Sequence, residues 1–92
     1  MMTVPENVAK ALGNAESIAR ERLAKFPHDG VGLHTIEQLR LIRAAASGGA
    51  AEAEALKNEF DLGLMAAKAL GSGEDEPFAD CLFEIDAFVR TV

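Results

Sequence analysis

Apolar side chains recur at steps of three and four residues along this chain, which is the spacing of one face of an α-helix. Four such segments, at about 4–26, 31–46, 50–70 and 77–90, are separated by residues typical of turns. Their apolar stripes are formed by Leu12, Ile18, Leu23 and Phe26, by Leu33, Ile36, Leu39 and Ile42, by Leu56, Phe60, Leu64 and Ala67, and by Phe78, Leu82, Ile85 and Val89. No segment alternates as a strand does, so the sequence predicts one all-α domain over 1–92, a compact bundle of four antiparallel helices with short loops.

The ends of these helices carry start and stop signals. Thr3–Glu6 fits a capping box, with Thr3 as the N-cap of the first helix. Pro27–Gly30 and Ser47–Gly49 have the composition of turns, and Gly71–Pro77 that of a loop whose proline suits a helix start. Because the 50–70 helix is apolar over a wide arc, we expect it to be the central one, in contact with more than one neighbour.

The 92 residues carry 9 basic and 15 acidic side chains, a formal net charge of −6. Residues 1–46 hold six basic and five acidic side chains, whereas residues 47–92 hold three and ten. Such an acidic half excludes nucleic-acid binding, which needs Lys and Arg. We expect no membrane association and a cytoplasmic location, since no long apolar run and no signal-peptide layout occur. The one cysteine, Cys81, is interpreted as a small buried apolar residue.

No grouping of side chains predicts catalysis. His28 and Asp29 are adjacent in a turn and lack a nucleophile. Glu52 and Glu54 stand two residues apart, so on a helix they do not share a face. The run Glu74–Glu76 lacks the ligand spacing of a calcium loop. We therefore expect no catalytic residue, no metal and no cofactor, which indicates a binding protein and not an enzyme.

The acidic half then becomes a candidate contact surface for a basic partner, because charge complementarity speeds encounter. Solubility alone is the simpler interpretation of the same charge. The partner-binding residues that the sequence predicts are Glu52, Glu54, Glu59, Asp61, Glu74, Asp75 and Glu76. The exposed side of the second helix, with Glu37, Gln38 and Arg40, is the rival surface.

Two strings of residues resemble a known family. Arg22-Leu23-Ala24-Lys25-Phe26-Pro27 closes the first helix, and Glu37-Gln38-Leu39 leads to Ile42-Arg43 in the second. This pattern resembles the small all-α immunity proteins that bacteria pair with type VI secretion effectors of the NAD(P)+ glycohydrolase kind. The resemblance is clearest over residues 22–43 and weaker over most of the chain. It implies a protein that binds its cognate toxin domain one-to-one and covers the NAD-binding active site.

Two other functions stay open. The chain could be a helical adaptor or regulatory subunit, self-associating through the apolar face of the 50–70 helix. It could also be a bundle that binds a small molecule, although the apolar stripes supply no converging polar groups.

Overall fold

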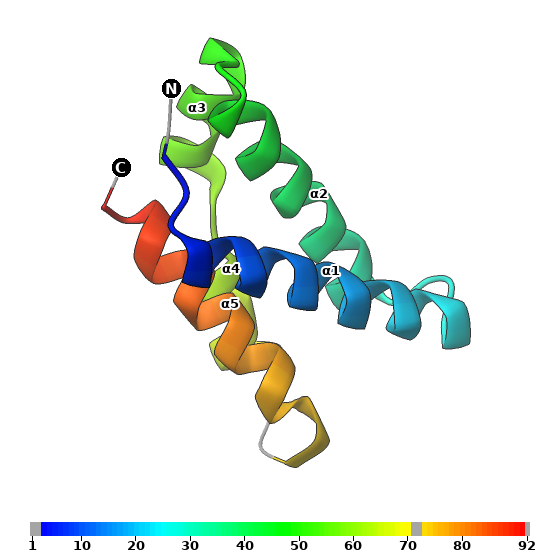
Figure 1. The fold of residues 1–92 in the computed structure, drawn as a ribbon. Helices are drawn as coiled ribbons and strands as arrows, with labels where there is room; N and C mark the ends of the chain where they lie inside the picture. The colour runs from blue at the N-terminus through cyan, green and yellow to red at the C-terminus, as the bar shows by residue number, and fades with distance from the viewer. Residues whose placement is uncertain (1–2, 71–72, 92) are drawn as a thin grey trace.

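The computed structural model describes residues 3–70 and 73–91, and five α-helices account for most of them (Figure 1). These are α1 (Glu6–Lys25), α2 (Gly30–Ala46), α3 (Ala50–Glu59), α4 (Leu62–Ala69) and α5 (Glu76–Val89), with a short 3₁₀ turn, η1 (Gly73–Asp75), before α5. Among the described residues there is no strand, so the expected all-α fold is confirmed. Gly71 and Ser72, from the predicted loop, lie outside the described residues.

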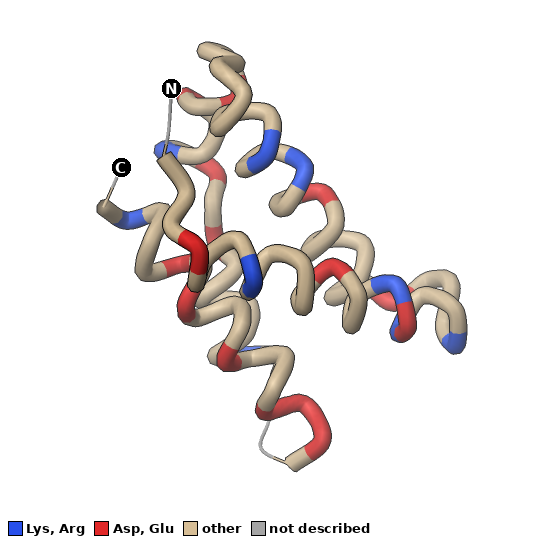
Figure 2. Tube along the Cα trace, in the orientation of Figure 1, with Lys and Arg blue, Asp and Glu red and all other residues tan. Residues whose placement is uncertain are grey.

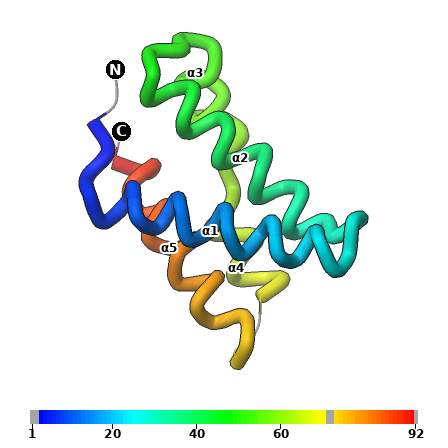
Figure 3. Tube along the Cα trace, turned by 45° about the vertical axis from the view of Figure 1, so that its right-hand side comes forward, coloured from blue at the N-terminus to red at the C-terminus, as the bar shows by residue number. Residues whose placement is uncertain are grey.

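The two longest helices, α1 and α2, diverge from the turn at 26–29 like the arms of a V (Figures 1 and 3). Helix α5 crosses α1 on the side away from α2, and α4 packs against α5. Helix α3 folds back on α2 at the far end of that arm. Together α3 and α4 pack against α2 and α5, so the 50–70 segment contacts more than one neighbour, as expected. It is not the one central element, because α1, α2 and α5 likewise each pack mainly against two of the four predicted segments.

Local hydrogen bonds fix both ends of α2. At its start the Asp29 carboxylate accepts the Gly32 amide at 3.0 Å, which satisfies one of the free N–H groups of the first turn. At its end Gly48 has a φ of 101°, a conformation that favours glycine. The amides of Gly48 and Gly49 donate to carbonyl oxygens of the last turn, each at 3.0 Å, and close a Schellman motif.

The ends of α1 and α5 differ in how well the sequence predicts them. Helix α1 begins at Glu6 with Pro5 as N-cap and no side-chain capping bond, so the predicted Thr3 cap is wrong. Thr3 lies two residues before the N-cap, too far back to take part in a capping box. Pro77 stands in the first turn of α5, as expected, because a missing N–H costs nothing there.

The predicted 50–70 helix is two helices, since Phe60 and Asp61 interrupt it. Phe60 is extended, with a ψ of 124°, and Asp61 has a φ of −146°. Gln38, which is only 4% exposed, accepts the Asp61 amide through Oε1 at 3.2 Å. His34 Nε2 lies 2.5 Å from Asp61 Oδ1. Gln38 thus supplies an acceptor for a backbone amide at the break, and it lies inside and not on an exposed surface.

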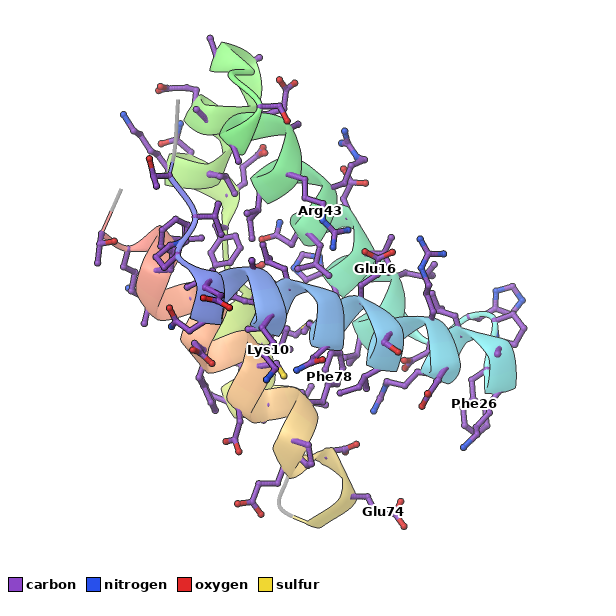
Figure 4. The ribbon with its side chains drawn as sticks, in the orientation of Figure 1. Lys10, Glu16, Phe26, Arg43, Glu74 and Phe78 are labelled. Atoms are coloured by element: carbon purple, nitrogen blue, oxygen red, sulfur yellow. The ribbon has the colours of Figure 1, made fainter. Side chains whose placement is uncertain are left out.

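The core lies where α1, α2, α4 and α5 meet, and its largest fully buried side chains include Phe78, Leu39, Ile42, Leu62, Leu82 and Ile85. Four members of the predicted apolar stripes are instead exposed, namely Phe26 (67%), Leu33 (51%), Leu64 (52%) and Ala67. Phe26 follows the last residue of α1 and points away from the bundle (Figure 4). Leu64 faces out because the break at 60–61 resets the helical phase, so α4 buries Leu62 and Ala66.

Candidate functional site

A row of carboxylates runs along the outer face of α5. Glu76, Asp80 and Glu84 are spaced by four residues, one helical turn apart, and all three are exposed. In the described part of the chain, none has a Lys or Arg nitrogen within 4.0 Å. Figure 2 shows these acidic positions following α5 upward from η1. We call Glu76, Asp80 and Glu84 the α5 row.

The packing of α5 fixes the position of the α5 row. Phe78, Leu82 and Ile85 of the same helix are essentially fully buried, which fixes the face that α5 turns to solvent. The side-chain amide of Asn7 on α1 donates through Nδ2 to Glu84 Oε1 at 2.7 Å. Phe83, 45% exposed, adds an apolar side chain to the same outward face. Aromatic side chains are enriched in protein contacts and polar residues form the rim around them, so Phe83 among the carboxylates gives this face the composition of a contact surface.

The residues that the sequence predicts as partner-binding do not form one surface. Glu52, Glu54 and Glu59 belong to α3, at one end of the molecule in Figures 1 and 3. Glu74 and Glu76 lie at the opposite end, where η1 meets α5 (Figure 4). The predicted carboxylates are thus divided between two ends, and Glu52 is half-buried. Only those at the α5 end continue into a longer row.

Two of the predicted binding residues, Asp61 and Asp75, already have partners within the chain. Asp61 contacts His34 at the break between α3 and α4. Asp75 Oδ1 accepts Arg22 Nη1 at 3.0 Å, and this bond ties the end of α1 to the start of α5. Both side chains therefore hold elements of the fold together and are less free than their neighbours to meet a partner.

Arg22 is the centre of that connection. Its Nε donates to Asp29 Oδ2 at 2.8 Å, and its guanidinium carbon lies 5.7 Å from the centre of the Phe78 ring. The hydrogen bond from Arg22 is the main reason that the pKa of Asp29 is lowered. One side chain thus links the α1–α2 turn, the Asp29 cap of α2 and the beginning of α5.

Arginines gather on a second surface, the open groove between α1 and α2. Arg20 Nε donates to Glu16 at 2.8 Å, and Arg43 on α2 reaches the same carboxylate from across the groove (Figure 4). These two arginines lower the pKa of Glu16. Arg40 holds Glu37 through two nitrogens, at 2.6 and 3.3 Å. We call this hollow of about 480 Å³ the arginine groove; Glu16, Arg20, Ile36, Leu39, Arg40, Arg43, Ala44 and Ser47 line it.

The other candidate residues, Asp29 and Cys81, are engaged or partly buried within the fold. Asp29 follows His28 in sequence, but its carboxylate is already paired with Arg22. Cys81 is half-buried, and burial raises the pKa of its thiol, so little thiolate forms near neutral pH. Residues 3–70 and 73–91 contain no group of three or more His, Cys, Asp or Glu side chains arranged to hold a metal ion.

Sequence reasoning missed Asp80 and Glu84, the two carboxylates that extend the surface along α5. A signal was present, since acidic residues at 76, 80 and 84 repeat at the spacing of one helical face. The consecutive run Glu74–Glu76 and the acidic residues of 50–61 were more conspicuous in the sequence.

Two further findings complete the description. No helix built from the described residues is long and apolar enough to cross a bilayer. No model of a known protein family, no curated protein and no solved structure matches this chain.

Proposed function

We propose that this chain is an immunity protein, which binds a cognate bacterial toxin domain one-to-one and covers its active site. The observation that carries the proposal is the α5 row, a line of exposed carboxylates without basic partners among the described residues. The toxin class follows from the resemblance of residues 22–43, which implies an NAD(P)+-hydrolysing type VI effector. On this proposal the chain acts in the cytoplasm of the cell that produces it, without a cofactor.

The charges suit such a role because an enzyme that binds an anionic dinucleotide needs a basic cleft. Because α5 packs against α1 and α4, the backbone that carries these carboxylates is already ordered, which lowers the entropic cost of binding. Opposite charges accelerate encounter, and a few desolvated contacts give the complex its lifetime. Phe83, beside the row, offers an apolar contact of that second kind.

The first test is co-expression with a secreted toxin encoded beside this gene. We expect the wild-type chain to restore growth of cells that make the toxin domain, and to bind it as a 1:1 complex. Failure to rescue, together with no complex by size-exclusion chromatography and light scattering, contradicts the proposal.

The second test locates the surface with two variants that remove equal charge. The row variant carries Glu76→Gln, Asp80→Asn and Glu84→Gln, and the matched control carries Glu52→Gln, Glu54→Gln and Glu59→Gln on α3. We expect the row variant to bind the toxin about 10- to 100-fold more weakly, with a slower association rate that depends less on salt. The control should change affinity by less than about threefold. If instead the α3 variant alone loses affinity, the docking face is α3 and not α5.

A further inference from the structure

The arginine groove has more hydrogen-bond donors than this chain satisfies. A guanidinium offers five N–H donors, so three of them offer about fifteen. Arg20, Arg40 and Arg43 direct only four side-chain hydrogen bonds among the described residues, all to Glu16 and Glu37. Those two carboxylates also hold the guanidinium groups in place, so the groove presents ordered donors that a further carboxylate can use.

The α5 row is complementary to this groove in the sign of its charge and in spacing. Successive carboxylates of the row lie about 6 Å apart along the helix axis, from a rise of about 1.5 Å per residue. Arg40 and Arg43 are three residues apart on α2, a similar separation along that helix, and Arg20 faces them from α1. Between the arginines the groove exposes apolar atoms of Ile36 and Ala44, and the row carries Phe83 on its outward face.

One molecule cannot satisfy both surfaces by itself. The arginine groove lies between α1 and α2, whereas α5 lies on the other side of α1 (Figures 1 and 4). The α5 row of a second copy is not held on that side of α1, so it can reach the groove. The contact would then be a helix that binds in a groove between two other helices. We infer that the arginine groove binds the α5 row of a second copy of this chain, so that the protein self-associates head to tail.

Such a contact is heterologous, which leaves a free groove at one end and a free row at the other. Further copies can add at these free surfaces, or the copies can close into a ring, so the average mass rises with concentration. Each pair of exposed charges contributes little, so we expect weak association. The net charge of −6 on each copy opposes contact at low salt, and screening reduces that repulsion at about 0.15 M salt.

The test is analytical ultracentrifugation of the full chain at about 0.15 M salt, from about 10 μM to 1 mM. The groove variant carries Arg40→Gln and Arg43→Gln, and the half-row variant carries Asp80→Asn and Glu84→Gln. We expect the average mass of the wild type to rise above 9.8 kDa with concentration. Each variant alone should associate about five- to tenfold more weakly. Mixed in equal amounts, the two should form a two-chain complex and nothing larger, since only one groove and one row then remain intact.

Two control variants remove the same charge elsewhere, namely Lys57→Gln with Lys68→Gln, and Glu54→Gln with Glu59→Gln. They should associate as the wild type does, and circular dichroism checks that every variant is folded. A wild type that stays at the monomer mass up to 1 mM overturns the inference, as does equal loss in the controls or a mixture that does not pair. None of these measurements uses the toxin, so their failure leaves the proposed immunity function standing. If both hold, toxin and second copy compete for the α5 row.

Discussion

Arg22→Met removes the guanidinium that joins three parts of the fold, while it keeps a flexible apolar stem against the ring of Phe78. In the wild type Arg22 is 28% exposed, and its partners Asp29 and Asp75 are 17% and 40% exposed. The substitution therefore leaves a partly buried Asp29 carboxylate with only its bond to the amide of Gly32. We expect a clear loss of stability, and little change in helix content while the protein stays folded.

The size of the loss follows from the individual contacts. The more buried bond, to Asp29, contributes about 1.5–2 kcal/mol as a hydrogen bond between charged groups. The exposed pair with Asp75 adds about 0.2–1 kcal/mol, and the contact over Phe78 about 0.5 kcal/mol. We therefore expect the free energy of unfolding to fall by about 2–3.5 kcal/mol. For a domain of this size that corresponds to a decrease in Tm of about 10–25 °C.

Thermal and urea unfolding followed by circular dichroism measure this loss, and pH gives a second signature. Because Arg22 lowers the pKa of folded Asp29, the stabilisation is complete above the ordinary aspartate pKa of about 3.9 and is lost as pH falls through the folded pKa. The difference between wild type and variant should therefore be full at pH 7 and should shrink in acid.

Arg20→Met is the matched control, because Arg20 is 68% exposed and pairs with Glu16 on the same helix. We expect that variant to lose less than about 0.5 kcal/mol. Equal losses in the two variants, or a loss below about 0.5 kcal/mol for Arg22→Met, would refute the assignment of Arg22 as the link between α1, α2 and α5.

Three further substitutions test the packing and the helix break. A Cβ on Gly63 would lie 2.5 Å from Cγ of the Asp86 carboxylate, so Gly63→Ala should cost about 1–3 kcal/mol in urea unfolding. Gly13→Ala, where nothing lies within 4 Å, should instead stabilise α1 by about 0.5–1 kcal/mol, and the same sign for both would contradict the close contact of α4 with α5. Gln38→Leu removes the acceptor of the Asp61 amide, and we expect a loss of about 1–3 kcal/mol and faster hydrogen exchange at that amide. Unchanged exchange there would mean that Gln38 does not hold the break.

The helix boundaries that depend on local chemistry could be predicted from the sequence. The turn at Pro27–Gly30 and the stop at Ser47–Gly49 are encoded by residues that act within one helical turn of themselves. The break at Phe60–Asp61 has no such signal, because it contains neither glycine nor proline and the apolar stripe continues through it. Its capping residue, Gln38, lies 23 positions away in sequence, so only the tertiary structure brings the two together.

The same distinction applies to the candidate surface. The acidic character of residues 47–92 is visible in the composition, but its division between α3 and α5 depends on how these helices pack. Asp75 looks like a free surface carboxylate in sequence, yet Arg22, 53 positions earlier, engages it. Phe26 is periodic with the stripe of α1 and still lies outside, since the helix ends one residue before it.

Helix α3 packs mainly against α2, and Leu56 is its one buried residue. An element with so few buried contacts has a low free energy of local opening, and it opens in a sub-global step before the rest of the fold. A protease that cuts α3 during such an opening would act at the end of the molecule opposite to η1 and the start of α5. If the proposed function holds, a cut in α3 would therefore leave toxin binding intact, because the α5 row and this sparsely buried helix are separate elements.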